Sequence, residues 1–410
     1  MARSETPDRL GGVLVRGALV LSAVLAAAPA GAAELPLGPP SLREHRVTRQ
    51  VADGVRLTRI RRTGAGGPFR VDVLAAAASR RIGVLTGHDR VPGLERVSEM
   101  ARRHDAVAGI NGGYFAPGAP DTGDPTGLVV VDGTVLSEPV GARTAFLVPR
   151  TGPARVAALS WAGFLTAGGA SRLVDGVDRN RGRIPACGGV GGDRPTDEID
   201  PSRTCTDASE LVVLTPAFGA RTGTSGGGYE AVVRDGTVTA VRRAADTAIP
   251  ADGYVLSGSG DAGRFLHRHL APGDTPDLAP DLLDDGAPLS PGDYAAIVGG
   301  APRLVRAGRV ALPAGLEGRA GDPGRNPRPI AGVRADGTVL FITIDGRRPA
   351  WSVGATLREA ARTARALGAA DAVELDSGGS TTMTVGAGVV NVPSDPGGER
   401  PVANGLFVLP

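Results

Sequence analysis

Lysine is missing from this 410-residue chain, so arginine supplies every one of its 45 basic side chains. Glycine (62 residues) and proline (33 residues) are abundant, and this combination is typical of a GC-rich coding bias, so the number of arginines says little about binding partners. The formal net charge of +2 is also too small to indicate a nucleic-acid partner, and we expect none. With 41% hydrophobic and 21% charged residues, the composition is that of a globular protein.

Long hydrophobic runs are also missing. The apolar run at residues 17–28 covers about 12 residues, whereas a helix that spans a bilayer needs roughly 20. Three arginines precede this run and the small residues APAGAAE follow it, which is the arrangement of a secretory signal peptide. We therefore predict that residues 1–33 are removed on export, that the proline-rich residues 34–44 form a linker, and that residues 45–410 form a secreted or otherwise extracytoplasmic domain without a membrane span.

Cysteine is scarce, with Cys187 and Cys205 as the only two. In an exported protein a single pair predicts one disulfide, which here would close a loop rich in glycine, proline and aspartate. The alternative is a pair of free or metal-bound thiols, but nothing nearby supplies the spacing of zinc ligands. We predict a disulfide-closed loop at 187–205.

Four segments predict β-hairpins. Each places Asp-Gly or Ala-Gly between runs of β-branched residues, and Asp-Gly is the pair that a two-residue type I′ turn prefers. They are VVVDGTVLS (129–137), VVRDGTVTAV (232–241), LVRAGRVAL (304–312) and VRADGTVLFI (333–342). Helical patterns are fewer and occur at residues 93–104, 262–270 and 354–369. The sequence therefore predicts an α+β fold with a mixed, largely antiparallel β-sheet and a few packed helices.

Two acidic residues follow predicted strands near the C-terminus. The strand in GTVLFITIDGR (337–347) ends at Asp345, a helix follows, and the next strand ends at Asp376. Strand, helix and strand form a βαβ crossover whose strands would be parallel, so both acids would emerge at one edge of the sheet. Two carboxylates placed together suit acid–base or nucleophilic chemistry on a sugar. The alternative is that each aspartate only caps a turn.

Small residues follow Asp376 directly. Gly378 and Gly379 would let backbone N–H groups face an anion, and the hydroxyl groups of Ser380 and Thr381 would add donors. A similar surface is predicted where another short strand ends. Its residues are Asn111, Gly112, Gly113, Tyr114 and Phe115. Both aromatic residues could equally pack in the core.

Three arginines lie near these segments in the sequence. Arg328 precedes a strand of the same unit, Arg347 follows Asp345, and Arg400 lies near the C-terminus. Each guanidinium group could form paired hydrogen bonds with a phosphate. Because every basic residue of the chain is arginine, any one of them taken alone is more often a surface residue than a ligand.

Three stretches together resemble the phosphodiester glycosidase family. They are GINGGYF (109–115), the segment 325–383 that contains ELDSGGSTTM, and VVNVPSDPGGERPVANGLFV (389–408). The resemblance covers residues 105–408 and is strongest from Arg325 onward. The family usually has Asp-Gly-Gly-Gly-Ser where this chain has Asp-Ser-Gly-Gly-Ser at 376–380, and this departure at Ser377 bears on the substrate more than on the fold.

The resemblance implies an exported hydrolase of the glycosidase type, which cleaves the bond between the anomeric carbon of a sugar and a phosphodiester. A phosphate monoester leaves readily, so such a reaction needs anion binding and a carboxylate more than strong general-acid help. On this hypothesis Asp345 and Asp376 flank the anomeric carbon, and Glu399 at the same site orients the sugar together with Asn111. The groups expected to hold the phosphate or line its pocket are Gly112, Gly113, Tyr114, Arg328, Arg347, Gly378, Gly379, Ser380, Thr381 and Arg400.

Two other functions fit the same residues. A non-catalytic cell-envelope module that binds anionic phosphoglycans would need the glycines and arginines but not both acids. A phosphodiesterase that cleaves the P–O bond would be expected to use a metal ion. No cofactor is otherwise expected, although carboxylates and carbonyls around Asp345 and Asp376 could hold Ca²⁺ in a loop without EF-hand order.

Overall fold

The computed structural model describes residues 34–141, 143–192, 203–224, 226–313 and 324–410. The predicted signal peptide, residues 1–33, lies outside the described residues, and so does the centre of the loop between the two cysteines. Within the described ranges, no helix has the length and apolar character required to cross a membrane.

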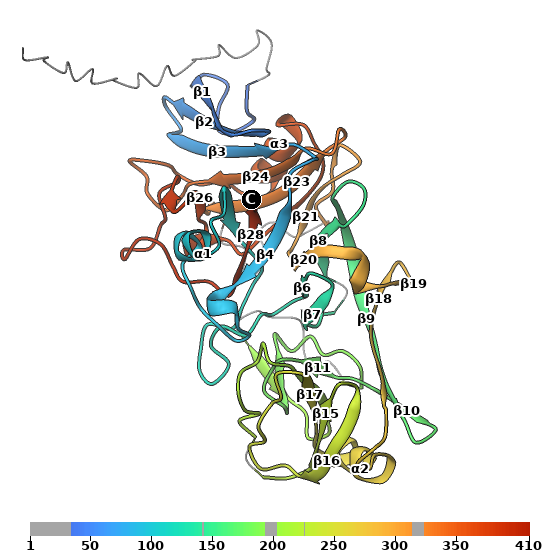
Figure 1. The fold of residues 1–410 in the computed structure, drawn as a ribbon. Helices are drawn as coiled ribbons and strands as arrows, with labels where there is room; N and C mark the ends of the chain where they lie inside the picture. The colour runs from blue at the N-terminus through green and yellow to red at the C-terminus, as the bar shows by residue number, and fades with distance from the viewer. Residues whose placement is uncertain (1–33, 142, 193–202, 225, 314–323) are drawn as a thin grey trace, which may run out of the picture.

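Antiparallel sheets make up most of the described chain, and three α-helices pack against them (Figure 1). The upper part of the molecule combines the two ends of the chain, whereas the middle of the chain, green and yellow, forms a lower lobe. Two long strands, β9 (Arg155–Ala167) and β18 (Asp277–Asp284), pair antiparallel and lead from the upper part toward this lobe. The fold agrees with the α+β prediction, although sheets dominate it.

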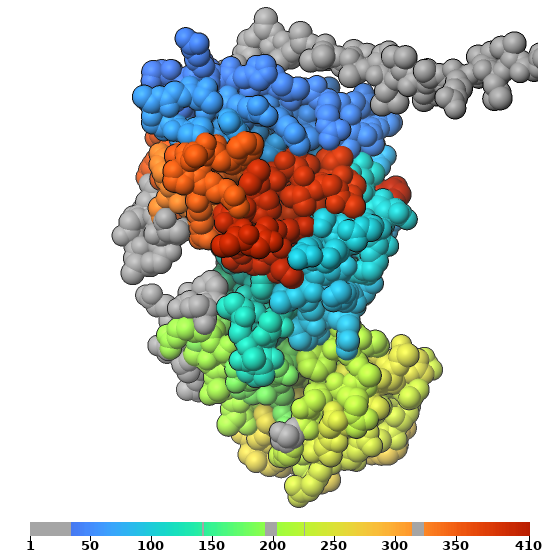
Figure 2. Space-filling view, turned by 90° about the vertical axis from the view of Figure 1, so that its left-hand side faces the viewer, coloured from blue at the N-terminus to red at the C-terminus, as the bar shows by residue number. Residues whose placement is uncertain are grey.

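The upper sheet contains eight strands in the part of the chain that is described. In spatial order they are β1 (Arg43–Ala52), β2 (Val55–Thr63), β3 (Phe69–Ala76), β24 (Val339–Ile344), β23 (Arg328–Arg334), β25 (Ala369–Glu374), β21 (Arg303–Arg306) and β22 (Arg309–Val310). N-terminal and C-terminal strands therefore share one sheet, and the space-filling view shows C-terminal residues packed directly below the N-terminal ones (Figure 2).

Strands β24 and β25 do not pair with each other, because β23 lies between them. The predicted βαβ crossover is therefore not confirmed as a pair of neighbouring strands. Strand β23 runs antiparallel to both β24 and β25, so these two strands run in the same direction. Their carboxyl ends consequently reach the same edge of the upper sheet, and the two predicted acids lie within two residues of these ends.

A five-stranded sheet packs against one face of the upper sheet through a shared apolar core. Its strands in spatial order are β27 (Gly388–Val389), β26 (Met383–Val385), β5 (Ala108–Asn111), β28 (Asn404–Val408) and β4 (Ile82–Thr86). Helix α1 (Val97–Arg103) buries Val97 and Met100 beside Phe407 of β28. The strand that ends at Asn111 is thus held next to the C-terminal strands.

Helix α3 (Leu357–Ala366) packs on the opposite face of the upper sheet. Apolar residues along one side of this helix are buried, including Leu357, Ala360 and Ala364. A capping box starts the helix, since the Thr356 hydroxyl accepts a hydrogen bond from the Glu359 N–H (3.2 Å) and the Glu359 carboxylate accepts one from the Thr356 N–H (3.0 Å).

The middle and lower sheets complete the molecule. The middle sheet contains β19 (Ala287–Leu289), β18, β9, β8 (Thr144–Pro149), β20 (Tyr294–Gly299), β6 (Val129–Val131) and β7 (Thr134–Ser137), with β10 (Ala170–Leu173) paired to β9. The lower sheet contains β11 (Gly176–Val177), β14 (Leu211–Leu214), β17 (Gly253–Gly258), β15 (Tyr229–Arg234) and β16 (Thr237–Arg243). Helix α2 (Gly260–His269) packs on the lower sheet, so all three predicted helices are confirmed. Helices α1 and α3 are shorter than predicted, whereas α2 begins two residues earlier than predicted and ends one residue earlier.

All four predicted hairpins are confirmed. They are the antiparallel pairs β6–β7, β15–β16, β21–β22 and β23–β24. At the first three turns both central residues have positive φ, as a type I′ turn requires: Asp132 and Gly133, Asp235 and Gly236, Ala307 and Gly308. At the fourth turn only Gly337 has positive φ, and the loop is longer.

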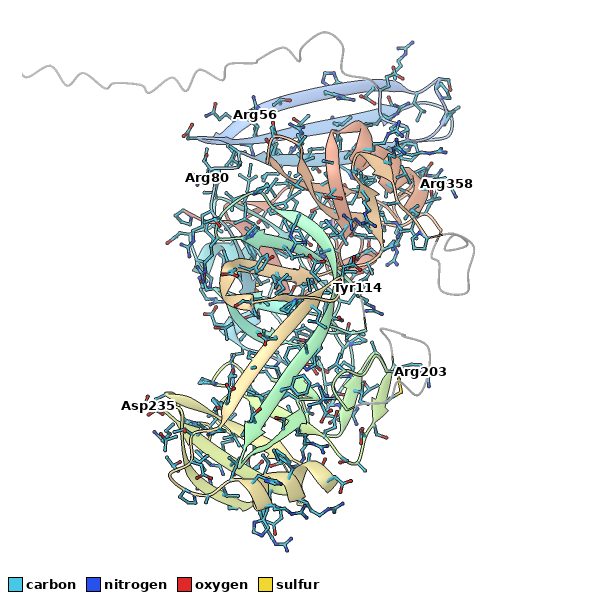
Figure 3. The ribbon with its side chains drawn as sticks, turned by 90° about the vertical axis from the view of Figure 1, so that its right-hand side faces the viewer. Arg56, Arg80, Tyr114, Arg203, Asp235 and Arg358 are labelled. Carbon is cyan, nitrogen blue, oxygen red and sulfur yellow. A yellow bond between two sulfur atoms is a disulfide. The ribbon has the colours of Figure 1, made fainter. Side chains whose placement is uncertain are left out.

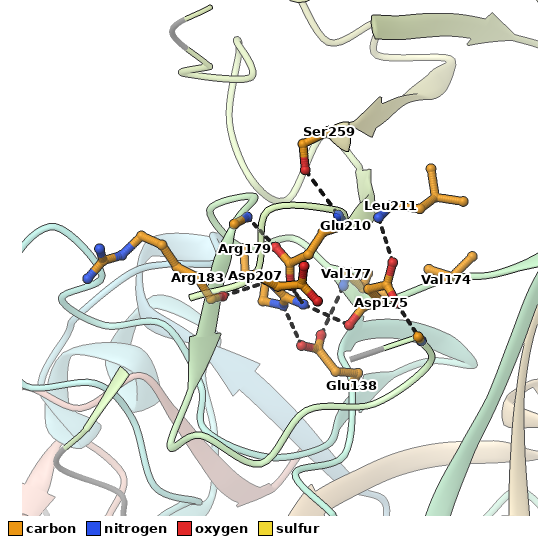
Figure 4. Close-up of polar contacts among 12 residues, drawn as sticks. Glu138, Val174, Asp175, Val177, Arg179, Arg183, Asp207, Glu210, Leu211 and Ser259 are labelled. Atoms are coloured by element: carbon orange, nitrogen blue, oxygen red, sulfur yellow. Dashed lines mark hydrogen bonds and ion pairs between the residues drawn. The ribbon is translucent and has the colours of Figure 1, made fainter. Parts of the chain in front are cut away.

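A buried ionic network joins the middle sheet to the lower lobe (Figure 4). The Arg179 guanidinium is 2% exposed and donates to Glu138 Oε1 (2.7 Å) and Glu210 Oε1 (2.6 Å). Cys187 and Cys205 form the predicted disulfide, with β12 (Arg183–Pro185) and β13 (Thr204–Thr206) paired beside it. These contacts stabilise the lower lobe and its attachment.

Candidate functional site

The two predicted acids lie at one edge of the upper sheet, where one amide connects their surroundings. Asp345 follows β24, and Asp376 follows β25 after one intervening residue. The Asn391 side chain donates both to Asp345 Oδ1 (3.2 Å) and to the Thr381 carbonyl (3.0 Å), while its own oxygen accepts from the Met383 N–H (2.8 Å). Asn391 therefore holds the loop that follows Asp376 against Asp345.

Asp345 is almost completely buried, at 2% exposure. Its Oδ2 accepts from Trp351 Nε1 (2.7 Å), and the Val392 N–H lies within 3.2 Å of both oxygens. Burial raises the pKa of Asp345, and the hydrogen bonds from Trp351, Asn391 and Val392 oppose that rise. Because both oxygens already accept hydrogen bonds, Asp345 could touch a sugar only if some of these bonds were exchanged.

Asp376 is only partly buried, and its backbone is held by the loop that follows β5. Its N–H donates to the Gly112 carbonyl (2.9 Å), and its carbonyl accepts from Asn111 Nδ2 (2.7 Å). Burial raises the pKa of the Asp376 carboxyl to about 6, against the hydrogen bond from Ser380 and the positive charge of Arg400. Asp376 is thus a carboxyl group that changes charge close to neutral pH.

Asn111 lies beneath this site, and its side chain is bonded to backbone groups. It is fully buried, and its Oδ1 accepts from the Thr382 N–H (3.1 Å). Gly112 must be glycine because a Cβ there would lie 2.0 Å from Asn404 Oδ1, the atom that accepts from the Gly113 N–H (2.9 Å). Asn111 therefore positions the Asp376 loop, where the sequence predicted a contact with the sugar.

Tyr114 lies near the middle of the molecule, between the upper sheets and the lower lobe (Figure 3). Its hydroxyl donates to the Ala301 carbonyl (2.7 Å), and the Arg143 guanidinium lies 5.9 Å from the centre of its ring. Burial raises its pKa well above the ordinary value, and the charges of Glu374 and Asp376 add to that rise. Tyr114 thus lies close to Asp376 with its hydroxyl already engaged.

Two guanidinium groups lie directly over the glycines that follow Asp376. A Cβ on Gly378 would lie 2.9 Å from Arg347 Nη2, and one on Gly379 would lie 2.1 Å from Arg400 Nη2. The short 3₁₀ turn η3 (Gly378–Ser380) therefore needs small residues because arginines pack on its backbone. The Gly378 N–H donates to the Pro327 carbonyl (3.0 Å), so this predicted anion donor is already engaged.

The two arginines at this turn differ in how they are held. Arg400 forms an ion pair with Asp395 (2.8 Å) and contacts Ser380 Oγ (3.4 Å). Arg347 is exposed, has φ of +58°, and is anchored by one hydrogen bond from its Nε to Asn326 Oδ1 (2.7 Å). Together they place positive charge beside Asp376, as the sequence predicted.

Arg328 and Glu399 have other partners. Arg328 is 2% exposed and pairs with Glu374 (2.8 Å), and its Nε donates to the Ala355 carbonyl (3.0 Å). The Glu399 carboxylate accepts from the N–H (2.8 Å) and the hydroxyl (2.5 Å) of Ser98 at the start of α1. Both contacts favour structural roles, and the predicted contacts with substrate stay predictions.

The hydroxyl residues beyond Gly379 are buried. Ser380 is fully buried and its side chain is hydrogen-bonded to Asp376, and Thr381 is 1% exposed. The Thr381 and Thr382 hydroxyl oxygens have no hydrogen-bond partner among the described residues. Ser380 therefore supports Asp376, while the predicted contact between Thr381 and the phosphate stays a prediction.

The sequence analysis did not single out three residues that lie at this site: Arg70, Asp72 and Trp351. Asp72 faces Thr343 across the β3–β24 pair, so its side chain lies on the same face of the sheet as Asp345. Burial raises the pKa of Asp72 to about 7, and the charge of Asp345 adds to that rise. The signal was present in FRVDVLA, where Arg70 and Asp72 interrupt an otherwise apolar strand at a spacing of two.

Metal ligands do not gather in the described ranges of the chain, since no three His, Cys, Asp or Glu side chains there are placed to share one ion.

A family model described as phosphodiester glycosidase matches residues 227–409. The resemblance predicted from the sequence is confirmed over these residues, which include both aspartates and Arg400. The match is shorter than the predicted 105–408 and leaves out the 109–115 segment and strand β3. No curated protein matches the chain.

Two of the solved structures that resemble this chain share its fold. A Burkholderia pseudomallei protein considered to be exported has 28% identity and a TM-score of 0.80, with 92% of this chain and 98% of that chain covered. A hypothetical protein from Synechocystis has 21% identity and a TM-score of 0.68; 90% of this chain is covered but only 64% of that one. The catalytic domain of zebrafish N-acetylglucosamine-1-phosphodiester α-N-acetylglucosaminidase, auto-inhibited by its pro-peptide, is more distant, with 13% identity, a TM-score of 0.41, and 93% and 87% coverage.

Proposed function

We propose that this chain, which carries a phosphodiester glycosidase region at residues 227–409, is an exported hydrolase of sugar-1-phosphodiesters. It would cleave the bond between the anomeric carbon and the phosphate oxygen. One arrangement carries the proposal: the partly buried Asp376 carboxyl, with its pKa of about 6, lies beside a glycine turn that Arg347 and Arg400 cover. Export is supported by the disulfide and by the similarity to a protein considered to be exported.

Each half of the arrangement matches one requirement of the reaction. The departing phosphate monoester carries negative charge, which Arg347 and Arg400 would bind. The anomeric carbon becomes positively charged as the bond breaks, and the ionised Asp376 would stabilise it or activate the attacking water. Asp345, held by Trp351 and Asn391, would act mainly by positioning the loop, because its oxygens are engaged.

The test is the variant Asp376→Asn, assayed with a fluorogenic sugar-1-phosphodiester. We expect a loss of kcat of at least about 100-fold with little loss of stability, since the amide has nearly the same shape. The matched control is Asp371→Asn on the same strand, whose carboxylate pairs with Arg303 (2.7 Å) away from the site. Full turnover in a folded Asp376→Asn protein would remove Asp376 from the mechanism.

Hydrolysis in ¹⁸O-labelled water separates the proposal from its alternatives. A glycosidase places the label in the sugar, whereas a phosphodiesterase that cleaves the P–O bond places it in the phosphate. Binding of a phosphoglycan by the wild-type protein without any cleavage would favour the non-catalytic envelope module.

A further inference from the structure

A row of charged side chains crosses three strands of the upper sheet and ends at Asp345, directly after the fourth strand β24. The strand register pairs His45 of β1 with Arg61 of β2, and Arg61 with Arg70 of β3. The Asp345 N–H donates to the Arg70 carbonyl (3.0 Å), which places Asp345 next in the row. Residues directly opposite each other on paired strands point to the same face, so the three basic residues line one path toward the acid.

Arg70 lies near the charge of Asp345 but forms no direct ion pair among the described residues. Its Nε and Nη1 are buried and have no hydrogen-bond partner, and no carboxylate lies within ion-pair distance of it in this part of the chain. Its guanidinium lies 4.8 Å from the centre of the Trp351 ring, and the Trp351 N–H donates to Asp345. A buried donor without a hydrogen-bond partner destabilises a folded protein, and most buried donors therefore have one. The unpartnered donors of Arg70 thus indicate a position where an acceptor would bind.

Arg61 adds a second positive charge at the same place. It is exposed and directly opposite Arg70, a cross-strand pairing of like charges that destabilises a sheet. The next row contains Arg59, whose ion pair with Asp72 is long (3.5 Å), and the exposed Val47, so the surface around Arg61 is open to solvent. An anion between Arg61 and Arg70 would relieve the repulsion, and a change of the Arg70 rotamer would bring its unpartnered donors to that anion.

We propose that Arg61 and Arg70, with Trp351 at 36% exposure as a stacking surface, form a second anion-binding subsite beside Asp345. The ligand is a second phosphate of the substrate, so the natural substrate class is a phosphoglycan with at least two phosphodiester groups. The proposal that this subsite affects turnover rests on the proposed function. It lies on β2, β3 and the segment after β24, so most of it falls outside the 227–409 family match.

The experiment compares two substrates with the same reacting sugar-1-phosphodiester. One has an uncharged aryl group, and the other carries a second phosphodiester on that group. The variant is Arg61→Ala, because Arg61 is exposed and its removal spares the fold. The matched control is Arg56→Ala, which removes the same charge from the same strand but from its opposite face.

We expect Arg61→Ala to raise KM for the two-phosphate substrate about tenfold, with kcat unchanged and the short substrate unaffected. Arg56→Ala should change neither substrate. The conservative variant Arg61→Lys should raise KM for the two-phosphate substrate less than Arg61→Ala does, because lysine keeps the positive charge but lacks the paired donors of arginine. An equal change for both substrates, or no change for either, would overturn the subsite.

Binding without turnover keeps this proposal separate from the proposed function. In an Asp376→Asn background, calorimetric titration with the two-phosphate compound should show weaker binding when Arg61→Ala is added. Absence of cleavage by the wild-type protein, together with Arg61-dependent binding, would contradict the glycosidase reaction but support the subsite. Cleavage by the wild type, together with equal binding of the two-phosphate compound in the presence and absence of Arg61, would support the glycosidase reaction and contradict the subsite.

Discussion

Asn111 Nδ2 donates a hydrogen bond to the backbone carbonyl of Asp376 at 2.7 Å, across 265 residues of sequence. The same side chain accepts from the Thr382 N–H, so one buried amide holds both ends of the loop that carries Asp376. The carboxyl group therefore owes its position to a strand of another sheet.

Replacing Asn111 should misplace this loop. Asn111→Ala would leave the buried Thr382 N–H without its acceptor, and we expect a loss of about 1–3 kcal/mol in the free energy of unfolding together with reduced kcat. Denaturant unfolding and steady-state kinetics measure the two effects. Asn180→Ala is the control, because the Asn180 side chain bonds Asp121 (3.0 Å) far from Asp376 in the sequence and should leave kcat intact.

Activity should rise with pH through about 6. The proposed step uses the ionised carboxylate of Asp376, whose pKa is about 6 in the folded protein, so kcat/KM should increase from about pH 5 to about pH 7. A pH–rate profile of the wild type measures this. A flat profile across that range would contradict the assigned role.

Stability should change with pH in the opposite direction. Because the pKa of Asp376 is raised from 3.8 to about 6, the folded state binds this proton more tightly than the unfolded chain does. The free energy of unfolding should therefore fall as the pH rises through that interval, and Asp376→Asn should lessen the fall. Asp72, with its pKa raised to about 7, extends the same trend to higher pH. Urea unfolding at several pH values tests it.

A methyl group at Gly379 should disrupt the arginine above it. The added Cβ of Gly379→Ala would lie 2.1 Å from Arg400 Nη2 and 2.2 Å from Asp395 Oδ1, so the ion pair must move. We expect kcat/KM to fall about 100-fold through misplacement of the charge. Gly397→Ala is a matched control, since no atom lies within 4 Å of its added Cβ. Equal activity of the two variants would contradict a role for Arg400.

Arg328 should prove to be structural. The variant Arg328→Ala removes the guanidinium group that pairs with the buried Glu374 carboxylate at 2.8 Å, and breaking a buried ion pair typically costs about 3–5 kcal/mol. The double variant Arg328→Met/Glu374→Leu should recover much of that loss, as measured by thermal or denaturant unfolding. If Arg328→Ala instead kept its stability and raised KM, the original prediction of a phosphate contact would hold.

Local features of the sequence predicted most of the elements. The Asp-Gly turns predicted the hairpins because only a few residue types accept positive φ at both central positions, and the apolar stripe of residues 354–369 predicted helix α3. The site was predicted less completely. Asp376, Gly379 and Arg400 do come together, whereas the Glu399 carboxylate is bonded to Ser98 at the start of α1.

The sequence by itself determined which segments form hairpins and helices, which two cysteines pair, and that acids follow two C-terminal strands, because these depend on backbone preferences and short-range patterns. Only the tertiary structure decided which side chains meet. The order of strands in the upper sheet inserts β3 beside β24, and this brings Arg70 and Asp72 next to Asp345. No local pattern encodes that order, since it results from the burial of two sheet faces at once.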